Sequence, residues 1–126
     1  MKEVINKIGK LAKELIEERG EIAFLALVLR EDDIAWEIVI SAQWIDDNRQ
    51  EALDYLVAKV QKSLTKNELL SISSIVFLQR SYFSENPPNG EAHTGWEEND
   101  IDLYGIAVKK AFIFLASDTE LQVARV

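Results

Sequence analysis

The stretch IAFLALVLREDDIAWEIVISAQW, residues 22–44, decides the fold. Its first part, residues 22–30, is a continuous apolar run, which is typical of a strand that is covered on both faces. An acidic turn follows. Beyond it apolar and polar residues alternate, so that Trp36 shares one face with Ile38 and Ile40. Two strand patterns joined by a short polar turn predict an antiparallel β-hairpin.

Helical patterns flank this hairpin on both sides. Apolar residues recur every three or four positions in residues 4–16, and Gly20 provides a C-terminal stop. The same period returns in residues 45–64, where Asp46 or Asp47 is predicted to cap the start of the helix. The spacing of Thr and Glu in the following TKNELL is that of a capping box and predicts one further helical turn.

Three more segments are predicted to form strands, namely residues 71–81, 103–117 and 121–126. Short connections predict antiparallel hairpins for the first two strands and for the last two. We therefore predict the fold class α+β. The chain would form a single two-layer domain over residues 1–126, with an antiparallel sheet of about five strands and two amphipathic helices on one face. The expected order of elements is α-β-β-α-β-β-β.

The predicted sheet has more apolar residues than one helix layer can cover. The strands at residues 22–30 and 103–117 are apolar on both sides, whereas both helices are expected on one face. One explanation is a second buried face formed by a homodimer or by a partner protein. The other is that strand curvature and a long loop cover this face within the chain.

The predicted order of helix, hairpin, helix and three strands resembles that of roadblock-type and other profilin-like modules. The resemblance is one of predicted topology, and no sequence motif accompanies it. It therefore carries no implication about function.

The composition of the 126 residues argues against several classes of function. The chain has no cysteine, which excludes disulfides, thiolate catalysis and cysteine-ligated zinc. Its net charge of -8 argues against nucleic acid and anionic membranes as partners, and agrees with a basic protein partner. No apolar run approaches the roughly 20 residues that cross a bilayer, and the start lacks a signal-peptide pattern. We expect a cytoplasmic protein without a cofactor.

A long acidic loop is predicted at residues 82–101. Six of the 22 acidic residues lie between residues 84 and 102, where there is no Lys or Arg. The run NPPNG within this segment is typical of turns. Loops of this length in a small domain are usually functional or disordered. This segment is therefore the first place to look for a function.

One interpretation of the acidic segment is a site for a protein partner. Trp96 would be an aromatic anchor, because large aromatic side chains dominate the energetics of interfaces. The carboxylates of Glu97, Glu98, Asp100 and Asp102 would surround it and steer a basic surface toward it.

Two other interpretations of the segment stay open. A metal or catalytic site could use His93 with Glu97, Asp100 and Asp102, although their spacing matches no specific site. Alternatively, the segment is a solvated loop with Trp96 folded back on the core.

Outside the loop, Trp36 and Trp44 are predicted to share one face of a strand. Large aromatic side chains on the inner face of a sheet usually belong to the core. The alternative is a small-ligand pocket between helices and sheet near one of these tryptophans.

The sequence thus favours a non-enzymatic interaction or regulatory protein that binds a protein partner through the acidic loop and an open sheet face. The alternatives are a small metal-dependent enzyme or metal-binding domain that uses His93, and a small-ligand-binding module.

Overall fold

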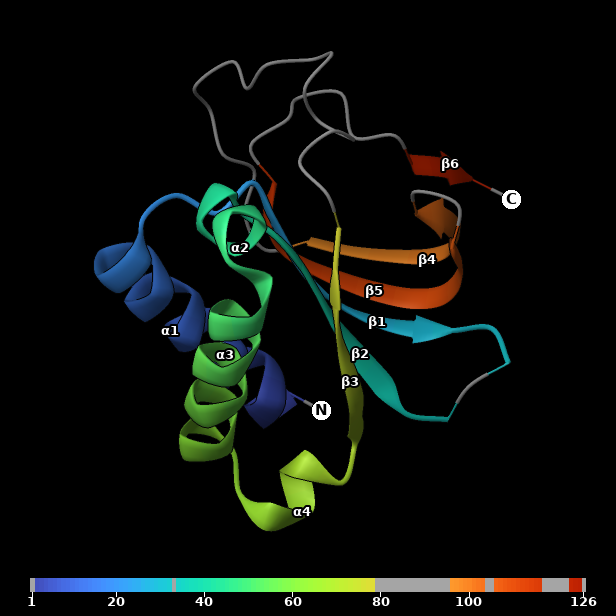
Figure 1. The fold of residues 1–126 in the computed structure, drawn as a ribbon. Coiled ribbons are helices and arrows are strands. Elements are labelled where there is room, and N and C mark those ends of the chain that lie inside the picture. The colour runs from blue at the N-terminus through green and yellow to red at the C-terminus, as the bar shows by residue number, and fades with distance from the viewer. Residues whose placement is uncertain (1, 33, 79–95, 104–105, 117–122, 126) are drawn as a thin grey trace.

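Two layers, one of helices and one of strands, build the computed structural model (Figure 1). It describes residues 2–32, 34–78, 96–103, 106–116 and 123–125. The elements are α1 (Lys2–Arg19), β1 (Phe24–Arg30), β2 (Trp36–Ser41), α2 (Gln43–Asp47), α3 (Arg49–Ser63), α4 (Lys66–Leu69), β3 (Ile72–Phe77), β4 (Trp96–Leu103), β5 (Ile106–Ala116) and β6 (Val123–Arg125). The predicted α+β class is therefore confirmed, with both long helices on one face of the sheet.

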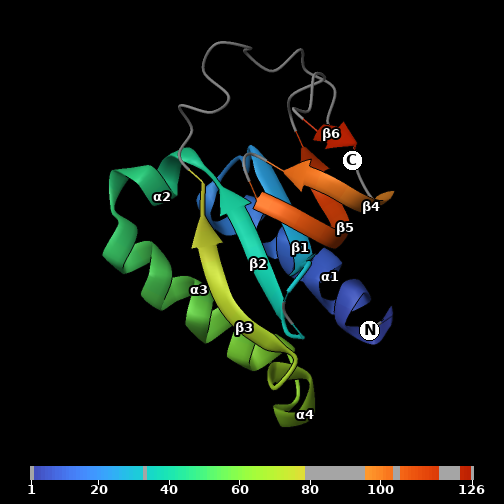
Figure 2. The ribbon, with the colours of Figure 1, turned by 90° about the vertical axis from the view of Figure 1, so that its right-hand side faces the viewer.

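The strands of the described residues form one mixed sheet in the order β3-β2-β1-β5-β4-β6. The predicted hairpin of β1 and β2 is confirmed, with Phe24 opposite Ser41. β5 lies antiparallel on the other side of β1. Viewed onto the sheet, α3 lies behind β2 and β3, while α1 lies behind β1 and β5 (Figure 2).

Two predictions about the sheet are wrong, namely that it is antiparallel throughout and that its last two strands form a hairpin. β3 pairs with β2 in parallel, because the chain crosses back along α3 before it enters β3. The sheet is consequently mixed and not antiparallel throughout. β6 was expected beside β5, but it pairs antiparallel with β4. A short connection thus joins β5 and β6 without making them a hairpin.

The helix ends follow from local sequence. α1 ends where Gly20 adopts a positive φ of 108° and donates its N–H to the carbonyl of Ile16 at 3.0 Å. α4 has the predicted capping box between Thr65 and Glu68. The expected cap of α3 is wrong, because α2 includes Asp46 and Asp47. The side chain of Asn48 caps α3 instead.

Apolar side chains from both helices and from the near side of the sheet form the helix-side core. Leu27 of β1 and Ile40 of β2 are fully buried there, together with Ile8 and Leu15 of α1. A side chain at Gly9 would contact the ring of Phe114 at 3.9 Å, so α1 runs close to β5. Burial of the apolar stripe of each helix is what holds the two layers together.

A second cluster, the far-side core, lies on the opposite face of the sheet. Its buried members are Ala23, Phe24, Ala26, Val28, Val39, Leu78, Ile101, Val108, Ala111 and Ile113. Phe24 and Ile113 have no exposed surface in the single chain. The expectation of an open sheet face is therefore wrong for these residues, and the far side does not need a second copy of the chain to be buried.

A partly buried ion pair lies on this same face. Glu37 is 6% exposed, and its carboxylate lies 2.6 Å from Nε of Arg30 in the neighbouring strand. Ser74 of β3 donates its hydroxyl to the same carboxylate at 3.2 Å. Because burying a charge costs free energy unless the charge is paired, these contacts allow the carboxylate of Glu37 to be buried on the far face of the sheet.

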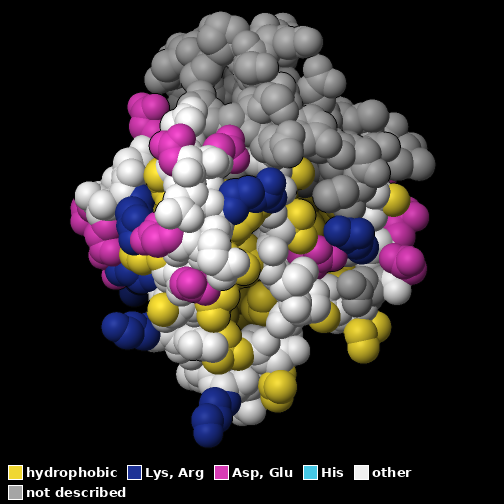
Figure 3. All heavy atoms as spheres, viewed as in Figure 1, with side chains coloured by type: hydrophobic (Ala, Val, Ile, Leu, Met, Phe, Trp, Pro, Cys, Tyr) yellow, Lys and Arg dark blue, Asp and Glu magenta, His cyan; other side chains and the backbone are white. Residues whose placement is uncertain are grey.

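Polar side chains bridge the outer surfaces of α1 and α3, where acidic and basic groups alternate (Figure 3). Glu18 accepts hydrogen bonds from Lys59 at 2.7 Å and from Tyr55 at 2.6 Å. These bonds lower the pKa of Glu18, and the bond to Glu18 raises the pKa of Lys59. Arg19 pairs with both carboxylate oxygens of Glu51 beside them. We call this set of residues the helix seam.

Candidate functional site

The predicted partner-binding residues all lie in β4. Trp96, Glu97, Glu98, Asp100 and Asp102 belong to this strand, so the last part of the expected acidic loop is a strand and not a loop. The sequence did not predict β4 because Asp, Asn and Glu are depleted in strands. Backbone pairing with β5 overrides that local preference.

Two of the described carboxylates of β4 lie on opposite faces of the sheet. Glu97 lies opposite Phe112 and therefore faces the helix layer, whereas Glu98 lies opposite Ala111 and belongs to the other face. Asp100 is exposed and has a positive φ of 51°. For Trp96 and Asp102 the structure describes the backbone pairing, and their side chains lie outside the described part, as does the whole of His93.

A hollow lies beside the first turns of α1, over part of β4 and β5. A helix with its side chains is about 10 Å wide and strands are about 4.8 Å apart, so two helices cover about four strands. The sheet has six strands. Part of its helix-side face must therefore be left without a helix above it.

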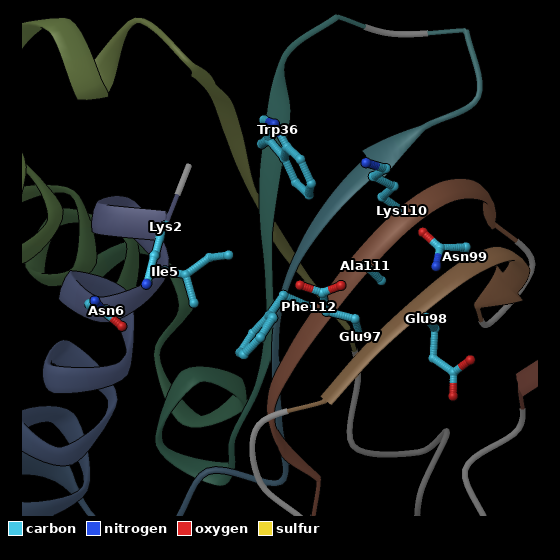
Figure 4. Close-up of a pocket in the computed structure, with 10 residues that line it drawn as sticks. All are labelled: Lys2, Ile5, Asn6, Trp36, Glu97, Glu98, Asn99, Lys110, Ala111 and Phe112. Atoms are coloured by element: carbon cyan, nitrogen blue, oxygen red, sulfur yellow. The ribbon is translucent and has the colours of Figure 1, made fainter.

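One wall of this hollow comes from α1 and the other from the sheet (Figure 4). Lys2, Ile5 and Asn6 of the first turns of α1 form the helical wall. Trp36 of β2 and Phe112 of β5 supply the aromatic surface of the other wall. The volume of the hollow is about 540 Å³. Both rings also pack against the helix-side core, which fixes their positions.

Charged and amide groups lie at the rim of the aromatic surface. Glu97 and Asn99 of β4, with Lys110 of β5, line the hollow beside Phe112. The carboxylate of Glu97 points to the space beside Phe112 (Figure 4). Glu98 also lines the hollow, but its carboxylate points away from the other labelled side chains. Among the described residues, no ion pair within 4.0 Å joins Glu97 to Lys110 or to Lys2. The hollow thus offers charges of both signs.

Of the two tryptophans singled out in the hairpin region, only Trp36 lines the hollow. Trp44 is not on the strand with Trp36, as was expected, but in α2. Its ring packs edge-on against Tyr55 with centroids 6.0 Å apart. The hollow thus lies near Trp36, one of the two tryptophans beside which the small-ligand hypothesis places a pocket.

Sequence reasoning missed most of the other lining residues. Lys109 and Lys110 interrupt the apolar run of β5 at a bulge. Leu29 pairs with Lys110, whereas the next residue of β1, Arg30, pairs with Val108, so Lys109 is skipped in the β1 register. The basic interruption of an apolar strand was the only feature of the sequence that marked this place.

The described residues do not include a group of three His, Asp or Glu side chains arranged to hold a metal ion. His93, on which the metal hypothesis depends, lies outside them. None of the helices in the described part of the chain is long and apolar enough to cross a membrane.

Comparison with known proteins gave no match to a family model, to a curated protein or to a solved structure. The function is therefore argued from the geometry of the hollow and of β4.

Proposed function

We propose that the protein is a non-enzymatic binding module and that its site is the hollow between α1 and the β4–β5 part of the sheet. The observation that carries this proposal is the hollow itself, with a volume of about 540 Å³ and an aromatic surface formed by Trp36 and Phe112. Pockets for small molecules have volumes of about 300–1,000 Å³, and a few polar groups orient the ligand on an apolar lining.

The framework of the hollow supports this assignment. Trp36 stands on β2 and Phe112 on β5, and each of these strands pairs with another strand on both sides. Both side chains pack against the helix-side core. Sites on rigid strands hold their side chains more precisely than sites on loops. A ligand would therefore find the aromatic surface already formed.

The titratable groups that line the hollow in the described residues are lysines and glutamates. These groups suit binding by charge and hydrogen bonds. We assign ligand binding to these groups on that ground.

A screen of amphipathic small molecules by two-dimensional amide NMR tests the proposal. We expect at least one class of compound to shift the amide signals of the first turns of α1 together with those of residues 110–112. Asn6→Trp places a large ring at the exposed wall of the hollow and is expected to abolish these shifts. Lys10→Trp changes an exposed residue one turn further along α1, outside the hollow, and is the matched control.

The proposal fails if the screen gives no localised shifts in the wild type. It also fails if Asn6→Trp binds the same compounds as Lys10→Trp, because the ligand would then lie elsewhere.

A basic protein partner on β4 is the second candidate function. Glu97 and Asp100 are exposed and Glu98 is half-buried, so three carboxylates lie within four residues of one strand. The net charge of -8 would attract a basic protein surface electrostatically. Dissolved salt shortens the range of this attraction. The buried far-side core removes the earlier reason for expecting a homodimer.

Capture of a partner from lysate separates this candidate from the first. Neutralising Glu97, Glu98 and Asp100 to Gln or Asn should release a partner that binds through β4, whereas Asn6→Trp should release a partner only if it inserts into the hollow. A partner that the neutralised variant retains in full would exclude recognition by these carboxylates.

A further inference from the structure

We propose that the hollow takes a small zwitterion with a large apolar side chain, that is, a free hydrophobic or aromatic α-amino acid or a close analogue. This inference rests on the proposed function and gives the chemical class of its ligand. It follows from charges of opposite sign that flank one aromatic surface without pairing with each other.

The positions of these charges are set by strand register. Glu97 lies opposite Phe112, and Asn99 lies opposite Lys110, so Glu97 and Lys110 are diagonal neighbours on adjacent strands. Such neighbours lie about 7–8 Å apart, with their Cβ atoms somewhat closer. No ion pair within 4.0 Å connects them, although their side chains are long enough to meet. The carboxylate and the ammonium are thus both available to a ligand that lies between them.

A zwitterion satisfies both groups at once. Its ammonium would donate to the carboxylate of Glu97, and its carboxylate would accept from the ammonium of Lys110. A ligand with a single positive charge would be attracted by Glu97 but repelled by Lys110. A ligand with a single negative charge would be attracted by Lys110 but repelled by Glu97. Charge-assisted hydrogen bonds to ionised groups are the stronger class of polar contact, which favours the doubly charged ligand.

The apolar part of the ligand is specified by the remaining surface. Trp36 and Phe112 offer ring faces, and Ile5 faces them from α1. Large apolar and aromatic side chains gain most from burial against such a surface, by about 25 cal/mol for each Å² removed from water. The amides of Asn6 and Asn99 can donate to or accept from the polar end of the ligand.

A matched set of ligands separates the two charges. Phenylalanine is titrated beside phenylalaninamide, which lacks the carboxylate, and N-acetylphenylalanine, which lacks the ammonium. We expect each analogue to bind about five-fold more weakly than phenylalanine, since exposed ion pairs contribute modestly. A dipeptide, which separates its charges by about one residue more, is expected to bind more weakly than the free amino acid.

Variants of the protein assign each charge to its residue. Lys110→Gln should weaken phenylalanine about five-fold but should not weaken phenylalaninamide, because that analogue has no carboxylate to lose a partner. Glu97→Gln should weaken phenylalanine but not N-acetylphenylalanine. Lys109→Gln and Asp100→Asn change neighbouring exposed charges that do not line the hollow, and should leave all three affinities unchanged.

The possible results separate this inference from the proposed function. Equal binding of the three phenylalanine compounds, or equal effects of Lys110→Gln and Lys109→Gln, would overturn the zwitterion and leave a binding site in place. Binding of some other class of compound at the hollow, with none of the three bound, would do the same. Failure of every compound in the wider screen to bind at the hollow would overturn the proposed function itself.

Discussion

The two faces of the sheet are buried by different means. On the helix side, α1 and α3 cover the sheet as far as β5, and the hollow begins where they end. On the far side, a second apolar cluster is buried in the single chain, with the Glu37–Arg30 pair at its polar end. The position of the hollow therefore follows from the width of the helix layer, because the sheet is wider than the two helices that pack on it.

Phe24 and Leu27 test whether the far-side core is as important as the helix-side core. They lie three positions apart in β1, point to opposite faces and are both 0% exposed. We expect Phe24→Ala to lower the free energy of unfolding by about 3–5 kcal/mol and Leu27→Ala by about 2–5 kcal/mol. Urea denaturation followed by circular dichroism measures both.

A loss of unfolding free energy below about 1 kcal/mol for Phe24→Ala would contradict the expectation that the two cores are similarly important for stability. It would mean that the far side relaxes easily when its largest side chain is removed, and that a single core beneath the helices stabilises the fold.

Glu37 tests the polar end of the far-side core. Glu37→Ala leaves Arg30 without its buried partner and Ser74 without an acceptor. The loss for a fully buried pair is about 3–5 kcal/mol, but Arg30 is partly exposed, so we expect about 2 kcal/mol. Glu31→Ala in the adjacent exposed turn should change stability by less than about 0.5 kcal/mol in the same urea experiment. Equal effects of the two substitutions would show that the ion pair is dispensable.

The helix seam provides the smallest expected effect, and one that depends on pH. Because hydrogen bonds from Lys59 and Tyr55 lower the pKa of Glu18, its ionised form stabilises the folded state. This stabilisation is complete above the ordinary pKa of about 4.5 and is lost as the pH falls through the lowered pKa of the folded protein. Glu18→Gln should therefore reduce the urea midpoint slightly near neutral pH and not at all in strong acid.

Glu17→Gln is the matched control for this measurement, because Glu17 is an exposed neighbour in the same helix. If both substitutions give the same difference at every pH, the seam does not contribute to the stability of the helix layer.

Much of the architecture could be predicted because local patterns and tertiary packing agree. The alternation from Trp36 to Ile40 is continuous in the sequence, and so are the apolar stripes of α1 and α3. The stop at Gly20 and the capping box at Thr65 depend on residues within one turn of each other. Interactions of this short range can be inferred without knowledge of the rest of the chain.

The strand pairings could not be predicted in the same way. β4 has the composition of a loop, and only its pairing with β5 makes it a strand. The parallel contact of β3 with β2 depends on how α3 crosses the sheet, which no local pattern specifies. The candidate site could not be predicted for the same reason, because its three strands, β2, β4 and β5, come together only in the assembled sheet.

The sequence by itself therefore determined the α+β class, the central hairpin, the two amphipathic helices and the concentration of acidic residues near Trp96. Only the tertiary structure decided that Glu97 and Lys110 become diagonal neighbours beside Phe112, and that Trp36 faces the same hollow. The physical reason is distance along the chain. Periodicity and caps act within a few residues, whereas strand register and the width of the helix layer are properties of the assembled sheet.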